Sequence, residues 1–186
     1  MDKKNIDNIG EESYIEKTNE AKDILDRIIN FVHGCDTKAS IVLGVVGVSL
    51  GLLLSDSYVK FIYHYLLEHY REKKCISFII ATSLITVILL FGIVKLISVL
   101  VAKCKPSEND SLVYFSDIAQ NKSSAEYRTK FINASEKDFF LDLMNDIYEN
   151  AKICRQKYKN YNIGLISVCV SALLLMIDIV VFIIVR

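Results

Sequence analysis

Residues 163–185 read IGLISVCVSALLLMIDIVVFIIV, an apolar run with one charged side chain, Asp178. At about 1.5 Å per residue, a helix of this length exceeds the roughly 30 Å hydrocarbon layer of a bilayer. Residues 76–102 form a second run of this kind with one charge, Lys95. A third run covers residues 39–54. The sequence therefore predicts an all-α membrane protein with three transmembrane helices.

The first of these spans is short. Residues 39–54 reach only about 24 Å as a helix. Either the bilayer thins and Lys38 snorkels to its surface, or the segment dips into lipid without crossing it.

The remaining residues predict a small cytoplasmic helical domain built from the N-terminal arm and the segment between spans two and three. Nine lysines and arginines lie near the membrane in these two parts, against four in the loop between spans one and two, so the positive-inside rule favours a cytoplasmic N-terminus. We expect a multi-pass protein of the bacterial inner membrane with this order of segments: cytoplasmic N-terminal helical arm 1–38, transmembrane helix 39–54, external loop 55–75, transmembrane helix 76–102, cytoplasmic helical region 103–162 and transmembrane helix 163–185.

Charge and motifs argue against several function classes. The chain has 22 basic and 22 acidic residues, so bulk electrostatics do not predict a nucleic-acid polymer as partner. It has no Gly-rich phosphate loop, nucleophile elbow or metal-ligand spacing, and its five cysteines are scattered. We therefore expect no catalytic residues, no metal and no cofactor.

Two stripes with alternating intervals of three and four residues predict long helices that lead into spans one and three. They either pack against each other or each cover a small core of their own. Ser123 and Ser135, each with an acid three residues later, predict two further helix starts. The first stripe is Tyr14, Thr18, Ala21, Leu25, Ile28 and Val32, and the second is Phe140, Met144, Ile147, Ala151, Cys154, Tyr158 and Tyr161.

Small and polar residues inside the spans indicate packing or a polar path. Gly44, Gly47 and Gly51 lie on one face of span one and predict a close helix contact, with span two, span three or another copy as partner. Asp178 lies about 12 Å from the outer end of span three. Three hydroxyls of span two are expected at the same depth, either lining a water path with Asp178 or hydrogen-bonding its protonated carboxyl; they belong to Thr82, Ser83 and Thr86.

Three short segments carry a resemblance to a known family. VHGCDTKASI occupies residues 32–41, LVYFSDIA occupies 112–119, and NAKI at 150–153 is followed by Lys157 and Tyr158. With the three-span layout, they resemble the membrane effectors of Pycsar, the bacterial pyrimidine-cyclase antiphage system. The resemblance covers roughly residues 24–165. Cys35 stands where that family has alanine, and Ser116 stands where it has glycine, so a role that needs positive φ there is in doubt.

The resemblance implies an antiphage effector switched on by a cyclic pyrimidine mononucleotide, cCMP or cUMP, from a partner pyrimidine cyclase. Activation would impair the inner membrane and cause abortive infection. One alternative is an effector that senses a cyclic oligonucleotide, and another is a membrane scaffold that binds a protein. A decisive two-state switch needs about 5.5 kcal/mol of differential binding, which favours several sites in a homo-oligomer.

A cyclic nucleotide needs a cation for its phosphate and an aromatic slot for its base. Asp36, Thr37 and Lys38 either bind this ligand or anchor the helix where it enters lipid, and the Tyr114–Ala119 segment either binds it or packs a helical core. The candidate ligand-binding residues are Asp36, Thr37, Lys38, Tyr114, Phe115, Asp117, Lys152 and Arg155.

Overall fold

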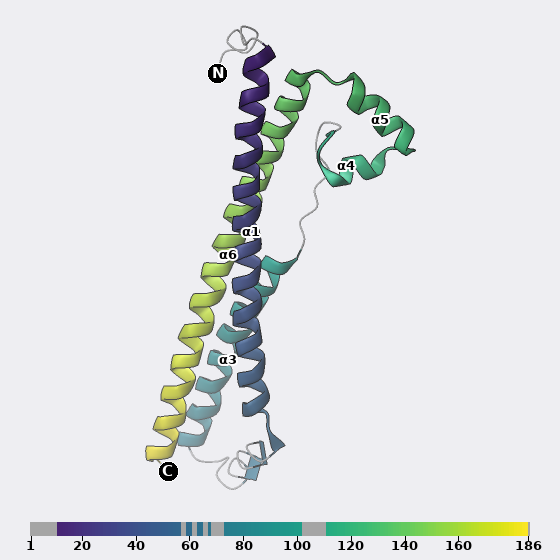
Figure 1. The fold of residues 1–186 in the computed structure, drawn as a ribbon. Coiled ribbons are helices and arrows are strands. Elements are labelled where there is room, and N and C mark those ends of the chain that lie inside the picture. The colour runs from purple at the N-terminus through teal and green to yellow at the C-terminus, as the bar shows by residue number, and fades with distance from the viewer. Residues whose placement is uncertain are drawn as a thin grey trace. The chain divides into compact units, whose positions relative to one another are not determined.

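A computed structural model describes residues 11–56, 59–60, 63–64, 67, 73–101 and 111–185. These residues form no strand, and the chain is an all-α membrane protein. Three of its helices are long and apolar enough to cross a membrane. The helices, drawn in Figure 1, are α1 (Glu11–Leu53), α3 (Lys73–Leu100), α4 (Phe115–Gln120), α5 (Ser124–Asn133) and α6 (Glu136–Val185).

Several sequence predictions fall outside the described residues. They concern residues 1–10 of the N-terminal arm, most of the 55–75 loop, and residues 102–110 at the start of the expected cytoplasmic region.

The chain divides into two compact units, which we call the polar unit and the apolar unit. The polar unit comprises Met1–His33 and Ala102–Gln156, and the apolar unit comprises Gly34–Val101 and Lys157–Arg186. Helices α1 and α6 each run through both units without a break.

In the apolar unit, α3 packs with the second halves of α1 and α6. Cys35 and Ala39 of α1 and Leu96 and Val99 of α3 are fully buried in one cluster, and Leu89 of α3 and Val168 of α6 complete it. Cys35 forms no disulfide and packs in this cluster as a small side chain.

Helices α3 and α6 approach most closely at two glycines. A Cβ atom on Gly164 would lie 2.8 Å from Leu96 Cγ and 3.0 Å from the Gly92 carbonyl oxygen. One on Gly92 would lie 3.0 Å from Ser167 Cβ. Only glycine allows this approach, which supplies the van der Waals contact that holds helices together in lipid.

In the polar unit, the first halves of α1 and α6 lie side by side, with α4 and α5 to one side of α6 (Figure 1). The rings of Tyr14 and Phe140 meet edge to face at 5.8 Å. Both predicted helix starts are present. Ser123 caps α5 by accepting from the Glu126 N–H, and Ser135 caps α6 by accepting from the Asp138 N–H.

The stripe predicted on α1 is confirmed, because Tyr14, Thr18 and Ala21 are buried and its other three members are half-buried. The stripe predicted on α6 is wrong at two members. Met144 is 43% exposed and Ala151 is exposed, whereas Leu143 is buried. Intervals of three and four residues connect Phe140 to Ile147 through Leu143 as well as through Met144, so the spacing alone does not choose between them. Farther along α6, Lys157 and Asn160 are also buried, and a search for apolar spacing leaves out such polar side chains.

Candidate functional site

The candidate ligand-binding residues fall in both units. Asp36, Thr37 and Lys38 belong to the apolar unit. The polar unit holds the other five: Tyr114, Phe115, Asp117, Lys152 and Arg155.

Asp36 forms an ion pair with Lys157. The lysine Nζ donates to both carboxylate oxygens, at 2.6 and 2.8 Å. The Lys157 side chain is 7% exposed, and that of Asp36 is 30% exposed. Thr37 and Lys38 are exposed on α1. Asp36 thus has a structural partner that joins α1 to α6.

Asp117 organises the loop that precedes α4. Its carboxylate is buried and accepts from the Ser111 backbone N–H at 3.2 Å. The Ser111 hydroxyl donates to Asp142 of α6 at 3.0 Å, and the Leu112 N–H donates to the same carboxylate oxygen at 2.7 Å. Tyr127 of α5 donates from its hydroxyl to the Leu112 carbonyl at 3.0 Å. These contacts fasten α4 and α5 to α6.

A third acid, Asp146, lies close enough to Asp117 and Asp142 to be affected by their charges, and the three form an acidic cluster. Burial, reinforced by the charges of Asp142 and Asp117, raises the pKa of Asp146 to about 6. Asp146 lies in the polar unit, well before the apolar segment of α6. The cluster stores unfavourable charge at neutral pH.

Of the remaining candidates in the polar unit, three are exposed, and Tyr114 is half-buried. Phe115 is 62% exposed, and its ring lies 4.9 Å from that of Tyr114. Lys152 pairs with Glu149 at 2.7 Å, and this bond raises the pKa of its ammonium. Arg155 is exposed.

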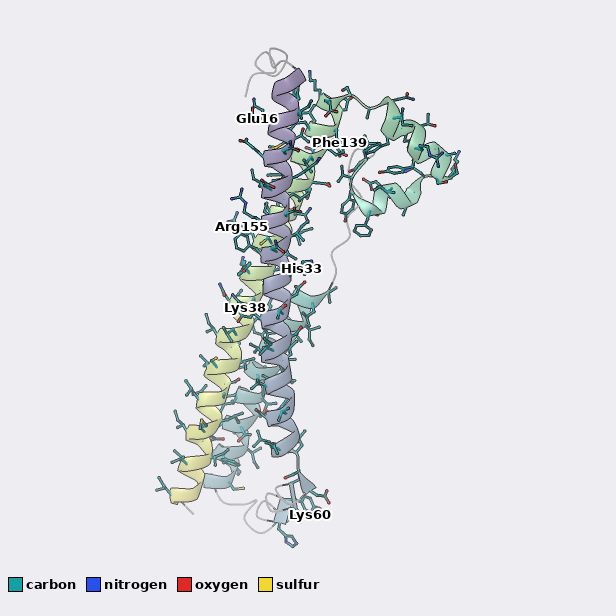
Figure 2. All side chains as sticks on the ribbon, viewed as in Figure 1. Glu16, His33, Lys38, Lys60, Phe139 and Arg155 are labelled. Carbon is teal, nitrogen blue, oxygen red and sulfur yellow. The ribbon has the colours of Figure 1, made fainter. Side chains whose placement is uncertain are left out.

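A groove of about 370 Å³ lies in the polar unit, between α1 and the region where α5 ends and α6 begins. Lys22 of α1 and Phe139 of α6 face each other across it, with Nζ 5.4 Å from the ring centre. Phe139 lies next to α1 in Figure 2. The sequence analysis did not predict this groove, because its residues are spread over three helices with no motif.

Inside the apolar unit, Asp178 contacts one of the three hydroxyls expected beside it, that of Thr82. Thr82 of α3 donates from its hydroxyl to a carboxylate oxygen of Asp178 at 2.7 Å. Thr86 instead donates to the Thr82 carbonyl at 2.8 Å, and Ser83 is exposed. A second polar contact joins the same helices, from the Asn160 amide to the Ser98 hydroxyl at 3.0 Å.

The three glycines predicted to form a close helix contact on α1 lie away from the other described helices. A Cβ atom on Gly44, Gly47 or Gly51 would meet nothing within 4 Å. Among the described residues, the close glycine contact is instead that of Gly92 with Gly164. Gly92 and Gly164 are each the only glycine of their apolar run, so the sequence contained a signal for this contact.

Two comparisons with known proteins identify relatives. A family model described as the Pycsar effector protein domain matches residues 20–186. The chain is also 26% identical over 162 residues to the Pycsar effector protein GmPycTM of Gulbenkiania mobilis, a match that covers 78% of this chain and 82% of that protein. No solved structure matches. Since the family model spans most of the described helices, the chain belongs to the Pycsar effector family, a family of transmembrane effectors of antiphage defence.

Proposed function

We propose that this effector is activated by cCMP or cUMP from a partner pyrimidine cyclase, and that activation impairs the bacterial inner membrane and causes abortive infection. Family membership is the observation that carries the proposal. The N-terminus and the polar unit face the cytoplasm in this proposal, where the nucleotide is made.

The continuity of two helices supports a mechanical link between ligand and membrane. Helices α1 and α6 each include residues of the polar unit and an apolar segment long enough to enter lipid. A nucleotide that binds one arrangement of their polar halves more tightly shifts the population of that arrangement. Because each helix is unbroken, its apolar half takes part in the shift.

Helix α1 supports assembly as the route to membrane damage. Only 6% of the residues in its most apolar window are buried within the chain, against 17% for α3 and for α6. A Cβ atom on Gly44, Gly47 or Gly51 of this helix would have open space around it. We expect a homo-oligomer in which α1 helices of neighbouring copies pack through these glycines.

Asp178 and Thr82 supply a polar contact inside the bundle. A carboxylate within a span costs roughly 2.5–3.5 kcal/mol on insertion scales, which makes an intramembrane acid a functional candidate. In the proposed oligomer, rearranged helices open this contact to water, and the membrane loses its barrier.

Ligand binding tests the proposal directly. Radiolabelled cCMP and cUMP are titrated against the full chain in detergent, with cAMP as the control nucleotide, and the mass of the complex is measured by light scattering. Saturable binding of a pyrimidine nucleotide and a rise in mass on binding are expected. Absence of binding, or binding equal to that of cAMP, contradicts the proposed signal.

A further inference from the structure

We propose that the groove between α1 and the α5–α6 junction is the nucleotide site and that it favours cytosine over uracil. The inference rests on the proposed function and adds the location and the base. The groove belongs entirely to the polar unit, and its volume of about 370 Å³ falls in the range of small-ligand pockets.

Lys22 provides the cation for the cyclic phosphate. It lines the groove, is exposed, and makes no ion pair within the part of the chain that the structure describes. Its ammonium lies over the face of Phe139, so it is held at the groove without being neutralised. A phosphate oxygen is the partner that such an ammonium lacks.

Two phenylalanines provide the surface for the base. Phe131 of α5 and Phe139 of α6 both line the groove, with ring centres 6.1 Å apart and ring planes at 82°. Phe131 is 48% exposed, although a ring of this size normally gains free energy from burial. A pyrimidine base stacked on the face of the Phe131 ring, with Phe139 at its edge, covers the exposed surface of Phe131.

The groove lining also contains a buried hydroxyl, that of Thr18. Thr18 is 4% exposed, and its Oγ1 has no hydrogen-bond partner among the residues that the structure describes. A buried polar group in this state calls for a water or a ligand atom. In the proposed complex, a small shift of the lining on binding lets a ribose hydroxyl reach this oxygen, and the hydroxyl supplies both a donor and an acceptor for it.

Glu136 selects the base. It lines the groove at the first residue of α6. Cytosine presents an exocyclic amine that a carboxylate accepts from, whereas uracil presents a carbonyl oxygen that a carboxylate repels. The groove must hold the Glu136 carboxylate and the ligand phosphate together. Lys22 offsets part of their combined negative charge. The N-terminal end of α6 also favours anions, because its backbone N–H groups carry partial positive charge.

The experiment titrates the full chain in detergent with cCMP and with cUMP and compares five variants with the wild type. Lys22→Gln is expected to weaken cCMP binding by about tenfold to hundredfold, as loss of a charged hydrogen bond does. Phe131→Leu is expected to weaken it by about tenfold, as loss of base stacking does. Glu136→Gln is expected to bring the affinities for cCMP and cUMP together.

Lys17→Gln is the control, and Phe115→Leu tests the rival site at α4. Lys17→Gln removes an exposed lysine of α1 that does not line the groove, and Phe115→Leu removes the exposed ring of the predicted α4 site. Both are expected to bind cCMP as the wild type does. Thermal unfolding of each variant checks that it is folded. Both substitutions are at exposed positions, so both variants are expected to fold.

The outcomes separate the two proposals. If the wild type binds neither nucleotide, the proposed function fails. If it binds and Lys22→Gln and Phe131→Leu bind equally well, the groove is not the site although the function stands. If Phe115→Leu alone weakens binding, the site lies at α4. If the wild type prefers cUMP, the role given to Glu136 is wrong.

Discussion

The ammonium of Lys157 on α6 lies 2.6 Å and 2.8 Å from the two carboxylate oxygens of Asp36 on α1. The two partners differ in burial, since the lysine side chain is 7% exposed and the aspartate 30%. This difference makes the pair asymmetric. Loss of the aspartate leaves a buried cation, whereas loss of the lysine leaves an anion that water reaches.

Asp36→Asn is therefore expected to lower the free energy of unfolding by about 2 kcal/mol, below the 3–5 kcal/mol of a fully buried pair because water screens Asp36. Lys157→Met is expected to cost less than about 1 kcal/mol. Thermal unfolding in detergent measures both. If Asp36→Asn is as stable as the wild type but loses cCMP binding, Asp36 is a ligand contact and not a structural one.

Gly164→Ala is expected to destabilise the bundle by about 1–3 kcal/mol, because its Cβ would overlap Leu96 Cγ and overpack the α3–α6 crossing. Gly44→Ala is the matched control, since its Cβ meets nothing within 4 Å. Thermal unfolding distinguishes the two. Equal midpoints for both variants would show that the α3–α6 crossing is not this close.

Gly44→Leu tests assembly through α1. The bulky side chain has open space within one chain, so the monomer is expected to unfold like the wild type. It blocks close approach of a second α1, so cCMP is expected to bind without raising the mass in light scattering. A variant that still assembles contradicts packing through this face.

Asp178→Leu tests the polar contact in the membrane. It removes the acceptor of the Thr82 hydroxyl, whereas Asp178→Asn keeps an oxygen there. We expect Asp178→Leu to bind cCMP normally and to abolish ligand-dependent leakage from vesicles, and Asp178→Asn to retain part of it. Full leakage with leucine shows that this contact is structural only.

Asp146 predicts a pH dependence of stability. Its pKa is about 6 in the folded chain, against an ordinary value of 3.8 for an aspartate in an unfolded chain, so the folded state binds more protons between these values. The free energy of unfolding is therefore expected to fall as pH rises from about 4 to about 6. Asp146→Asn removes this loss and is expected to be more stable than the wild type at pH 7 but not at pH 4.

Asp138 is the matched control for this titration. Hydrogen bonds from the Ser135 hydroxyl and backbone lower its pKa, so its contribution has the opposite sign and is lost as pH falls. Asp138→Asn is expected to be less stable than the wild type at pH 7. A wild type whose stability is flat between pH 4 and pH 6 contradicts the raised pKa of Asp146.

The pattern of apolar residues in the sequence predicted the three long helices and the buried face of α1. The three apolar runs lie in three long helices, and the stripe from Tyr14 to Val32 is the buried face of α1. On α6 the same method was wrong at Met144, because Leu143 fits the three- and four-residue intervals between Phe140 and Ile147 equally well. It also skipped Lys157 and Asn160, which are polar and buried through hydrogen bonds.

The site was less predictable than the fold. Sequence order suggested that cations and rings near the membrane bind the ligand, but Asp36 is paired with Lys157 and Asp117 closes a loop. Lys22 and Phe139 are far apart in the sequence and meet only because α1 and α6 pack together. Such a meeting is a consequence of tertiary structure and leaves no local motif.

Release of a trapped dye from lipid vesicles that contain the purified full chain tests the central claim most directly. Addition of cCMP to the face that carries the polar unit is expected to release the dye in a saturable manner, with no release by cAMP and none from vesicles without protein. Vesicles that stay sealed with cCMP and with cUMP, while the protein binds either nucleotide, would contradict the proposal that the bound nucleotide breaches the membrane.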